Sequence, residues 1–322
     1  MSLDPHSFPA LSDTVSEQAR SFLQVLIQAG QKNMVAPLPD DTEAWQTLYT
    51  QAENMLLELA APLVKANKVS MQDTLLGGTP VVKLTPEDCD LQAPPVIYLH
   101  GGAFTLLSAR STAGLGSALA RATRRRLLAI DYTPAPRANW KTIHHEIHRA
   151  YEALINQGVP LHRIATIGDS AGGNLALSAV LNLRDAGLGQ CGPVALLSPW
   201  ADLANRGDTA LTLAHADPTL SYDNLLHNSA LAYTQDLNLN DARVSPLFAD
   251  FTRGFPPTLI QDGTRTILLS TSVRLYQALD AAGQNVTLDL YEGMWHVFQG
   301  GPYPESERAL AKIAAFLDTH AT

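Results

Sequence analysis

The hexapeptide GDSAGG, residues 168–173, constrains the fold of this chain more strongly than any other stretch of the sequence. It follows an apolar run that ends at Ile167 and precedes a segment with helical periodicity, which indicates a turn from a strand into a helix. Glycine is needed at Gly168 and Gly172, where side chains would collide in so tight a turn. The turn is predicted to hold Ser170 with its hydroxyl group exposed, as a nucleophile requires.

Short apolar runs alternate with helix-length segments through most of the chain after about residue 81. The apolar runs are VVKL, PVIYLH, RLLAIDY, RIATIGD, PVALLSP, PTLIQD and VTLDLY. The segments of helical length include residues 111–124, 141–157, 172–186 and 268–282. This alternation favours a mostly parallel sheet with helices on both faces, and such sheets bind ligands at the carboxyl ends of their strands.

Two segments depart from the alternation and predict a helical cap. Residues 1–70 carry apolar side chains at helical spacing, and residues 203–251 contain helical pieces but no convincing strand. We therefore expect one catalytic domain, formed by residues 71–202 and 252–322, with the segments 1–70 and 203–251 covering its strand ends. The predicted fold class is α/β, with a mostly parallel sheet flanked by helices and a helical cap.

Composition narrows the possible partners of the chain. Its 322 residues, 46% of them hydrophobic, suffice for one large domain with an insertion. A net charge of −9 argues against nucleic acid or an anionic membrane as a partner. Cys89 and Cys191 are too few for a disulfide framework and lack metal-ligand spacing. The first 20 residues lack a signal-peptide pattern and no apolar run is as long as a membrane span, so we expect a cytoplasmic protein.

A second motif, HGGAF at residues 100–104, follows the apolar run PVIYLH. Ester hydrolysis passes through a tetrahedral oxyanion, and fixed backbone N–H groups that point at this oxygen stabilise it by several kcal/mol. A Gly-Gly turn lets the backbone approach the reacting atoms closely. The N–H of Ala171, directly after the serine, completes the predicted set of donors.

His296, in the motif EGMWHVF after the last predicted strand, is the candidate general base. An imidazole titrates near neutral pH, and its place after the serine in the chain suits this role. The acid limb of kcat/KM is then expected near neutrality. His144, His145 and His148 form another cluster, but they lack an acidic companion of the metalloprotease type, so we expect a solvated helix face and no metal site.

Six blocks together resemble the hormone-sensitive-lipase family of bacterial esterases. They occur in the family's order between about residues 95 and 300, as HGGAF, DYTPAP, GDSAGG, SPWADL, VSPLFAD and EGMWHVF. The resemblance implies an α/β-hydrolase fold and hydrolysis of short-chain carboxylic esters by a Ser–Asp/Glu–His triad, without a cofactor. Carried over by position, Ser170 is the nucleophile and His296 the base, and the oxyanion donors are Gly102, Ala103 and Ala171.

The sequence departs from the family's pattern in three places. Ala103 stands where many members have a third glycine, and a backbone donor survives that change. Arg137 replaces the usual acidic residue after DYTPAP. Aligning PPTLI, residues 256–260, with the family's strand before the acid puts the expected carboxylate at Thr266. A threonine cannot stabilise an imidazolium as a carboxylate does.

Asp262 is the predicted replacement for this acid. It ends the apolar run PTLIQD before Thr266 and keeps the chain order Ser–Asp–His, so we expect it to accept a hydrogen bond from Nδ1 of His296. Asp202, after the neighbouring strand, and Glu292, on the same loop as the histidine, are alternatives. A site with no acid at all is the remaining possibility.

These features predict a serine carboxylesterase that hydrolyses small esters with short acyl chains through an acyl-enzyme. The alternatives are a lactone hydrolase with the same mechanism and a non-catalytic small-molecule receptor with a hydrolase fold. The expected partner is a small-molecule ester, with no nucleic acid and no membrane. A homodimer is an expectation from the family alone.

Overall fold

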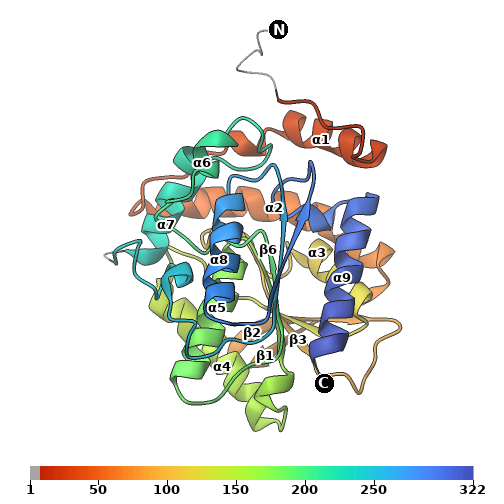
Figure 1. Ribbon diagram of the computed structural model, residues 1–322, viewed down its shortest axis with the longest axis vertical. Coiled ribbons are helices and arrows are strands. Elements are labelled where there is room, and N and C mark those ends of the chain that lie inside the picture. The colour runs from red at the N-terminus through yellow and green to blue at the C-terminus, as the bar shows by residue number, and fades with distance from the viewer. Residues whose placement is uncertain (1–7, 236, 322) are drawn as a thin grey trace.

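The computed structural model describes residues 8–235 and 237–321, and an eight-stranded sheet forms its centre (Figure 1). The strand order is β1-β2-β4-β3-β5-β6-β7-β8. Strands β3 to β8 are parallel, whereas β2 pairs antiparallel with both β1 and β4 at one edge. The strands are Val69–Leu76 (β1), Thr79–Pro86 (β2), Val96–Leu99 (β3), Leu127–Ile130 (β4), Ala165–Asp169 (β5), Val194–Leu197 (β6), Thr258–Gly263 (β7) and Val286–Tyr291 (β8).

Helices cover both faces of the sheet (Figure 1). On one side lie α3 (Ala113–Thr123) and α9 (Pro304–His320), and on the other α4 (Trp140–Asn156), α5 (Ala171–Asp185) and α8 (Leu269–Ala281). Because successive side chains of a strand point to opposite faces, β3 contributes to both cores. Ile97 and Leu99 pack with residues of α4 and α5, whereas Val96 and Tyr98 pack with residues of α3 and α9. Strand β3 therefore has buried hydrophobic side chains along its whole length, as a parallel strand covered on both sides must have.

Further helices lie across one end of the sheet, at the top of Figure 1. They are α1 (Glu17–Ala29) and α2 (Thr42–Ala66) near the N-terminus, and α6 (Thr209–Thr212), the π-helical turn η3 (Tyr222–Leu226) and α7 (His227–Thr234) between β6 and β7. Short 3₁₀ turns complete the chain at Gln31–Asn33 (η1), Leu161–Arg163 (η2), Pro246–Phe248 (η4) and Phe298–Gly300 (η5). The residue before α1, Ser16, donates its hydroxyl hydrogen to Glu305 of α9 at 2.7 Å, which fixes this helix to the body of the protein.

The predicted fold class is confirmed. The structure also contains two elements, β1 and α9, that the sequence pattern does not predict. The edge strand β1 has mostly exposed side chains, so its sequence VSMQDTLL lacks the apolar run that marks the inner strands. Helix α9 follows the EGMWHVF motif in the chain and packs on the core of one face of the sheet. Within residues 8–235 and 237–321, no helix combines the length and the apolar character that crossing a membrane requires.

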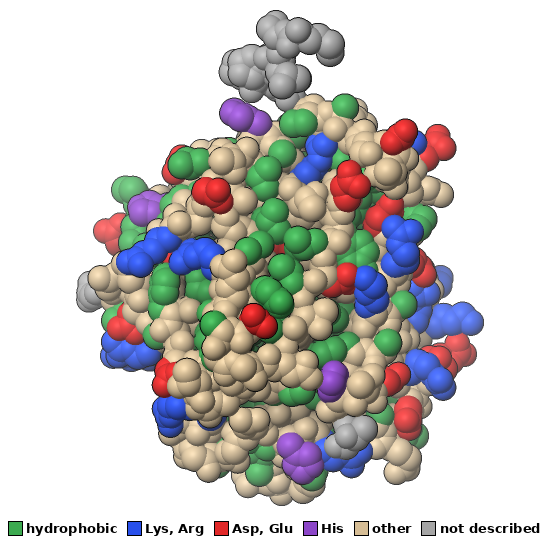
Figure 2. All heavy atoms as spheres, viewed as in Figure 1, with side chains coloured by type: hydrophobic (Ala, Val, Ile, Leu, Met, Phe, Trp, Pro, Cys, Tyr) green, Lys and Arg blue, Asp and Glu red, His purple; other side chains and the backbone are tan. Residues whose placement is uncertain are grey.

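Charged side chains of both signs are interspersed over the face of the molecule in Figure 2, and hydrophobic ones gather between them in its upper half. Several charged pairs in the structure are between exposed groups, such as Lys68 with Glu87 at 3.5 Å. Such pairs contribute little to stability in water, so the fold depends mainly on its two apolar layers.

The sheet order brings the sequence motifs together. Because β3 and β5 are neighbours, the HGGAF turn after β3 lies beside Ser170, which follows β5. The next three strands in the sheet are β6, β7 and β8, and their carboxyl ends lead to Ser198, to Asp262 and to the loop of His296. All of these groups are therefore at one edge of the sheet, where parallel α/β folds bind their ligands.

Candidate active site

Ser170 lies at the turn from β5 into α5 in a backbone conformation that L-residues rarely adopt, with φ 54° and ψ −121°. The close approach of the surrounding backbone leaves no room for side chains. A Cβ at Gly168 would lie 2.3 Å from the carbonyl oxygen of Gly172, and a Cβ at Gly172 would lie 1.9 Å from that of Leu99. Both glycines are therefore required, as the sequence predicts.

The HGGAF turn has three successive residues with positive φ, Gly102 at 110°, Ala103 at 53° and Phe104 at 66°. A Cβ at Gly102 would lie 2.2 Å from the carbonyl oxygen of Leu106, whose own N–H donates to the carbonyl of Gly102 at 2.8 Å. This compact turn holds the backbone next to Ser170. The N–H of Ala171 belongs to the first turn of α5, where an amide has no acceptor within its helix.

Asp169, the variable residue of the GDSAGG motif, is a contributor that the sequence analysis does not single out. Its buried carboxyl group accepts hydrogen bonds from the hydroxyl of Tyr98 at 2.5 Å and from the N–H of Gly101 at 3.1 Å. Burial raises the pKa of Asp169 to about 6, and the hydrogen bond from Tyr98 opposes this rise. Because Asp169 directly precedes Ser170, its carboxyl group connects the HGGAF turn to the turn that holds the serine. Its signal in the sequence is an acid between two glycine-rich turns.

His296 follows β8 and borders the same cavity as Ser170, Gly102 and Ala103. Its side chain is buried, which lowers the pKa of the imidazole to about 3. Its Nδ1 atom has no hydrogen-bond partner among the described residues. The structure therefore brings the candidate base to the site of the serine in its neutral form.

A cavity of about 360 Å³ extends from Ser170 and His296 towards the helices above the sheet. Its walls are mainly apolar. Helix α2 contributes one face, because its lining residues recur every three to four positions. Met55 and Leu59 on this face are 52% and 56% exposed, so they lie at the mouth of the cavity. The residues of α1, α2 and η3 that line it are Phe22, Leu26, Ala52, Met55, Leu56, Leu59, Ala60, Leu63, Leu225 and Leu226.

Asp262 ends β7 and is fully buried, but it does not make the predicted contact with His296. One carboxyl oxygen accepts from the N–H of Gly263 at 2.9 Å, and the other accepts from the hydroxyl of Ser272 in α8 at 2.6 Å. The prediction of a direct hydrogen bond from Nδ1 of His296 is therefore wrong, because these donors hold the carboxyl group elsewhere. Burial raises the pKa of Asp262 to about 7, and the bond from Ser272 opposes this rise.

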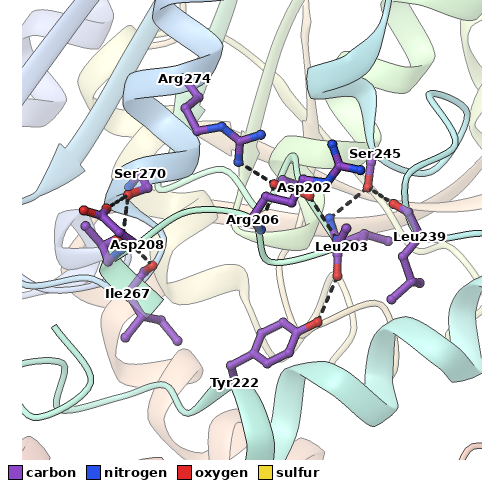
Figure 3. Close-up of polar contacts among 12 residues, drawn as sticks. Asp202, Leu203, Arg206, Asp208, Tyr222, Leu239, Ser245, Ile267, Ser270 and Arg274 are labelled. Atoms are coloured by element: carbon purple, nitrogen blue, oxygen red, sulfur yellow. Dashed lines mark hydrogen bonds and ion pairs between the residues drawn. The ribbon is translucent and has the colours of Figure 1, made fainter. Parts of the chain in front are cut away.

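Asp202 is engaged in a different network, drawn in Figure 3. Its carboxylate pairs with the guanidinium of Arg274 at 2.5 Å and accepts from the N–H groups of Ala204 at 3.0 Å and Arg206 at 3.2 Å. Asp202 therefore shapes the chain after β6. It does not act as an acid for the histidine in this structure.

Glu292 and Thr266 are also committed to other contacts. Glu292 is exposed and accepts from the hydroxyl of Thr14 at 3.0 Å. Thr266 is fully buried, and its hydroxyl oxygen accepts from the N–H of Leu268 at 3.2 Å, where α8 begins. At the position where the family resemblance places the acid, the threonine side chain therefore accepts a hydrogen bond from the backbone at the start of α8.

The loop after β7 is bound to the loop of His296 by backbone contacts. The N–H of Arg265 donates to the carbonyl of Met294 at 2.9 Å, and the N–H of Gly293 donates to the hydroxyl of Thr264 at 2.9 Å. A Cβ at Gly263 would lie 2.1 Å from the same Met294 carbonyl. The two loops therefore form one packed unit, although the expected side-chain contact within it is missing.

The histidine cluster on α4 is only partly solvated. Nε2 of His144 lies 2.8 Å from the hydroxyl of Tyr233, and burial lowers the pKa of this histidine to about 4. The predicted solvated face is therefore wrong for His144, whereas His145 is exposed. Across the part of the chain that the structure describes, no group of three or more His, Cys, Asp or Glu side chains could hold a metal ion.

Arg137, the second departure from the family's pattern, contacts a helix above the cavity. Its guanidinium lies 4.6 Å from the ring centroid of Tyr49 in α2. A cation over an aromatic ring stabilises the contact by roughly 0.5–1 kcal/mol at an exposed site. The substitution therefore joins α2 to the loop after β4.

Comparison with known proteins agrees with this geometry. A family model described as "alpha/beta hydrolase fold" matches residues 96–300. An esterase of Acinetobacter venetianus is 36% identical over 69% of this chain and 73% of its own length. An acetyl-hydrolase of Streptomyces hygroscopicus is 35% identical over 70% of this chain and 75% of its own.

A solved structure points to the same group of enzymes. An esterase from the bacterial hormone-sensitive lipase family superposes with a TM-score of 0.80 and 27% identity, covering 94% of this chain and 98% of that one. The chain belongs to the α/β-hydrolase family and is of the hormone-sensitive-lipase type. It is a carboxylic ester hydrolase.

The variant Asp262→Asn is expected to gain stability relative to the wild type as the pH rises. Burial raises the pKa of Asp262 in the folded protein to about 7 from 3.8, so this group's contribution to stability is fully present below the lower value. It is lost as the pH rises through the folded pKa, because the unfolded chain releases its proton first. Asparagine does not titrate. The difference in Tm between variant and wild type should therefore increase from about pH 4 to about pH 8. A difference that is independent of pH would contradict the raised pKa.

Proposed function

We propose that this protein is a serine carboxylesterase that acts on small esters with short acyl chains. The observation that carries the proposal is the convergence at one cavity of Ser170 in its strained turn, His296 and the HGGAF backbone. A nucleophile, a neutral base and fixed N–H donors at one place are what acyl transfer requires.

The first half of the reaction forms an acyl-enzyme. The Oγ of Ser170 attacks the ester carbonyl carbon while His296 accepts the hydroxyl proton. The carbonyl oxygen becomes an oxyanion and accepts hydrogen bonds from the N–H groups of Gly102, Ala103 and Ala171. The bond to the alcohol oxygen then breaks, and the protonated imidazole gives its proton to the departing alcohol.

The second half hydrolyses this intermediate. A water molecule attacks the acyl carbon while His296 accepts one of its protons, and the same N–H groups stabilise the second oxyanion. The bond to Ser170 breaks as the imidazole returns the proton to the serine oxygen. The carboxylic acid is released, and the chain's own residues are restored to their initial state.

The preference for short acyl chains is supported by the size of the cavity. Its volume of about 360 Å³ is close to the lower end of the range of about 300–1,000 Å³ that is usual for small-molecule sites. One relative in the comparison is named an acetyl-hydrolase. The helices α1 and α2 and the segment between β6 and β7 act as the cap that limits this volume and excludes water from the reacting groups.

Labelling with a fluorophosphonate probe tests the serine mechanism. The folded wild type is expected to take up one probe per chain at Ser170, located by mass spectrometry of the peptides, and Ser170→Ala should take up none. Ser178 lies buried in the same helix and serves as a matched control, because Ser178→Ala should label like the wild type. Folded wild type that stays unlabelled would exclude the mechanism.

A series of p-nitrophenyl esters tests the acyl-chain preference. We expect kcat/KM to be highest for acyl chains of about two to six carbons, since longer chains exceed the space under the cap. Each ester is measured below its critical micelle concentration, so that aggregation of the substrate does not enter the comparison. A preference for long-chain triglyceride emulsions would be incompatible with this proposal.

The pH dependence of kcat/KM tests the environment of His296. Burial lowers the pKa of this histidine to about 3, so the acid limb expected near neutrality from sequence moves to lower pH. The base stays neutral as the pH falls, and kcat/KM should be level from about pH 8 to about pH 5 while circular dichroism reports folded protein. An acid limb centred near the ordinary imidazole pKa of about 6.5 would contradict this expectation.

A further inference from the structure

The hydroxyl group of Ser198 lies between the end of β7 and the loop of His296. Ser198 follows β6 and is fully buried, and its N–H donates to the carbonyl of Gln261 in β7 at 2.8 Å. Its φ of 47° is uncommon for a residue with a side chain. This strained turn gives the hydroxyl group a fixed direction.

The oxygen of this hydroxyl group accepts a hydrogen bond from the N–H of Val297 at 3.1 Å. That N–H belongs to the peptide group directly after His296, and Val297 itself has a φ of 52°. The chain therefore turns sharply next to the histidine, and the hydrogen bond from the N–H of Val297 to Ser198 holds this turn. Fixing the peptide group at the base of a side chain restricts the direction in which its ring projects.

The carboxyl group of Asp262 accepts hydrogen bonds from the N–H of Gly263 within β7 and from the hydroxyl of Ser272 of α8. The hydroxyl group of Ser198 also lies near this carboxyl group and, like Ser272, opposes the rise that burial causes in its pKa. Asp262 is therefore a buried anchor held by its own strand and by α8, and Ser198 lies between it and the loop of the histidine. Ser198 follows β6, Asp262 lies in β7 and His296 follows β8. These three strands are successive neighbours in the sheet, so the three residues lie at the same edge.

We propose that Ser198 and Asp262 are positioning residues, which hold the loop of His296 in place of the carboxylate that a triad would supply at Thr266. The proposal rests on the serine mechanism proposed above. In a triad the acid accepts a hydrogen bond from Nδ1 and so fixes the ring directly. In this protein the hydroxyl of Ser198 and the packed backbone of the two loops hold the backbone of His296, and the position of its ring follows from that.

The variant Ser198→Gly tests the link with little strain, because glycine adopts positive φ readily. The displacement of a catalytic group by about 1 Å can cost on the order of 100-fold in rate. We expect kcat for a p-nitrophenyl ester to fall by about 10- to 100-fold, with KM changed by less than about threefold, because the cavity is intact. An unchanged kcat in folded Ser198→Gly would overturn the proposal.

Ser245 provides a matched control. It is also a fully buried serine that holds a loop, since its oxygen accepts from the N–H of Leu203 at 2.8 Å and its hydroxyl donates to the carbonyl of Leu239 at 2.6 Å (Figure 3). Ser245→Ala should lower the Tm but leave kcat within about twofold of the wild type. A loss of kcat equal to that of Ser198→Gly would mean that any buried serine has this effect, and would overturn the specific role.

A second variant covers the possibility that Ser198→Gly does not fold. Asp262→Leu keeps most of the side-chain volume and removes the carboxyl group that lies near the Ser198 hydroxyl group. It should show the same fall in kcat at nearly constant KM. A loss of about 10⁴-fold would instead indicate direct contact of Asp262 with the histidine during catalysis, as removal of a triad acid does.

Restoring the acid gives the sharpest readout. Thr266→Asp and Thr266→Glu each put a carboxylate at the family's position, and the variant with the higher kcat serves as the background for Ser198→Gly. In that background the loss of kcat should shrink to less than about threefold, because the carboxylate holds Nδ1 directly. An undiminished loss contradicts the positioning role. Failure of the wild type to label at Ser170 would overturn the serine mechanism itself, whereas labelled wild type with an unaffected Ser198→Gly would overturn only the positioning role.

Discussion

The close contact between α5 and β3 is the constraint on which the rest of the site depends. Gly172 in the first turn of α5 lies so near the carbonyl oxygen of Leu99 that a Cβ there would be 1.9 Å away. This contact brings the first turn of the helix, with the N–H of Ala171, against the strand that leads into the HGGAF turn. Ser170 and the backbone N–H groups of the HGGAF turn are therefore positioned by the same packing, and a change that separates α5 from β3 would displace both together.

The electrostatics of His296 differ from those of a triad histidine. Burial disfavours the charged form of an imidazole, and a neighbouring carboxylate normally offsets that cost. Here Asp262 is bound by other donors, and the described residues offer Nδ1 no hydrogen-bond partner. In the proposed mechanism, the imidazolium that forms when Ser170 loses its proton is therefore stabilised less than in a triad. That mechanism depends more on orientation of the ring by its backbone than on stabilisation of its charge.

The sequence predicts the architecture well because its signals are local. A glycine-flanked serine between a strand and a helix, and apolar runs separated by helical segments, each follow from backbone sterics and burial within a few residues. Ser170, His296 and the HGGAF turn are brought to one cavity for this reason. The hydrogen-bond partners of Asp262 could not be predicted in this way, because its position near the end of β7 does not determine the direction of the carboxyl group. Its carboxyl group accepts hydrogen bonds from Ser272 in α8 and from the N–H of Gly263, and neither residue carries a chemical motif of its own.

A hydroxyl link and a carboxylate are not equivalent substitutes. A carboxylate at position 266 would do two things, because it would orient the imidazole and lower the free energy of its charged form. Ser198 can orient the loop through the N–H of Val297, but a neutral hydroxyl group that contacts the backbone and not the ring adds little to the stability of an imidazolium. In the mechanism that we propose, the chain therefore accepts a lower rate together with a base that is hard to protonate. A histidine that stays neutral in mildly acidic solution is still able to accept the proton of Ser170 under conditions in which a triad histidine is already charged.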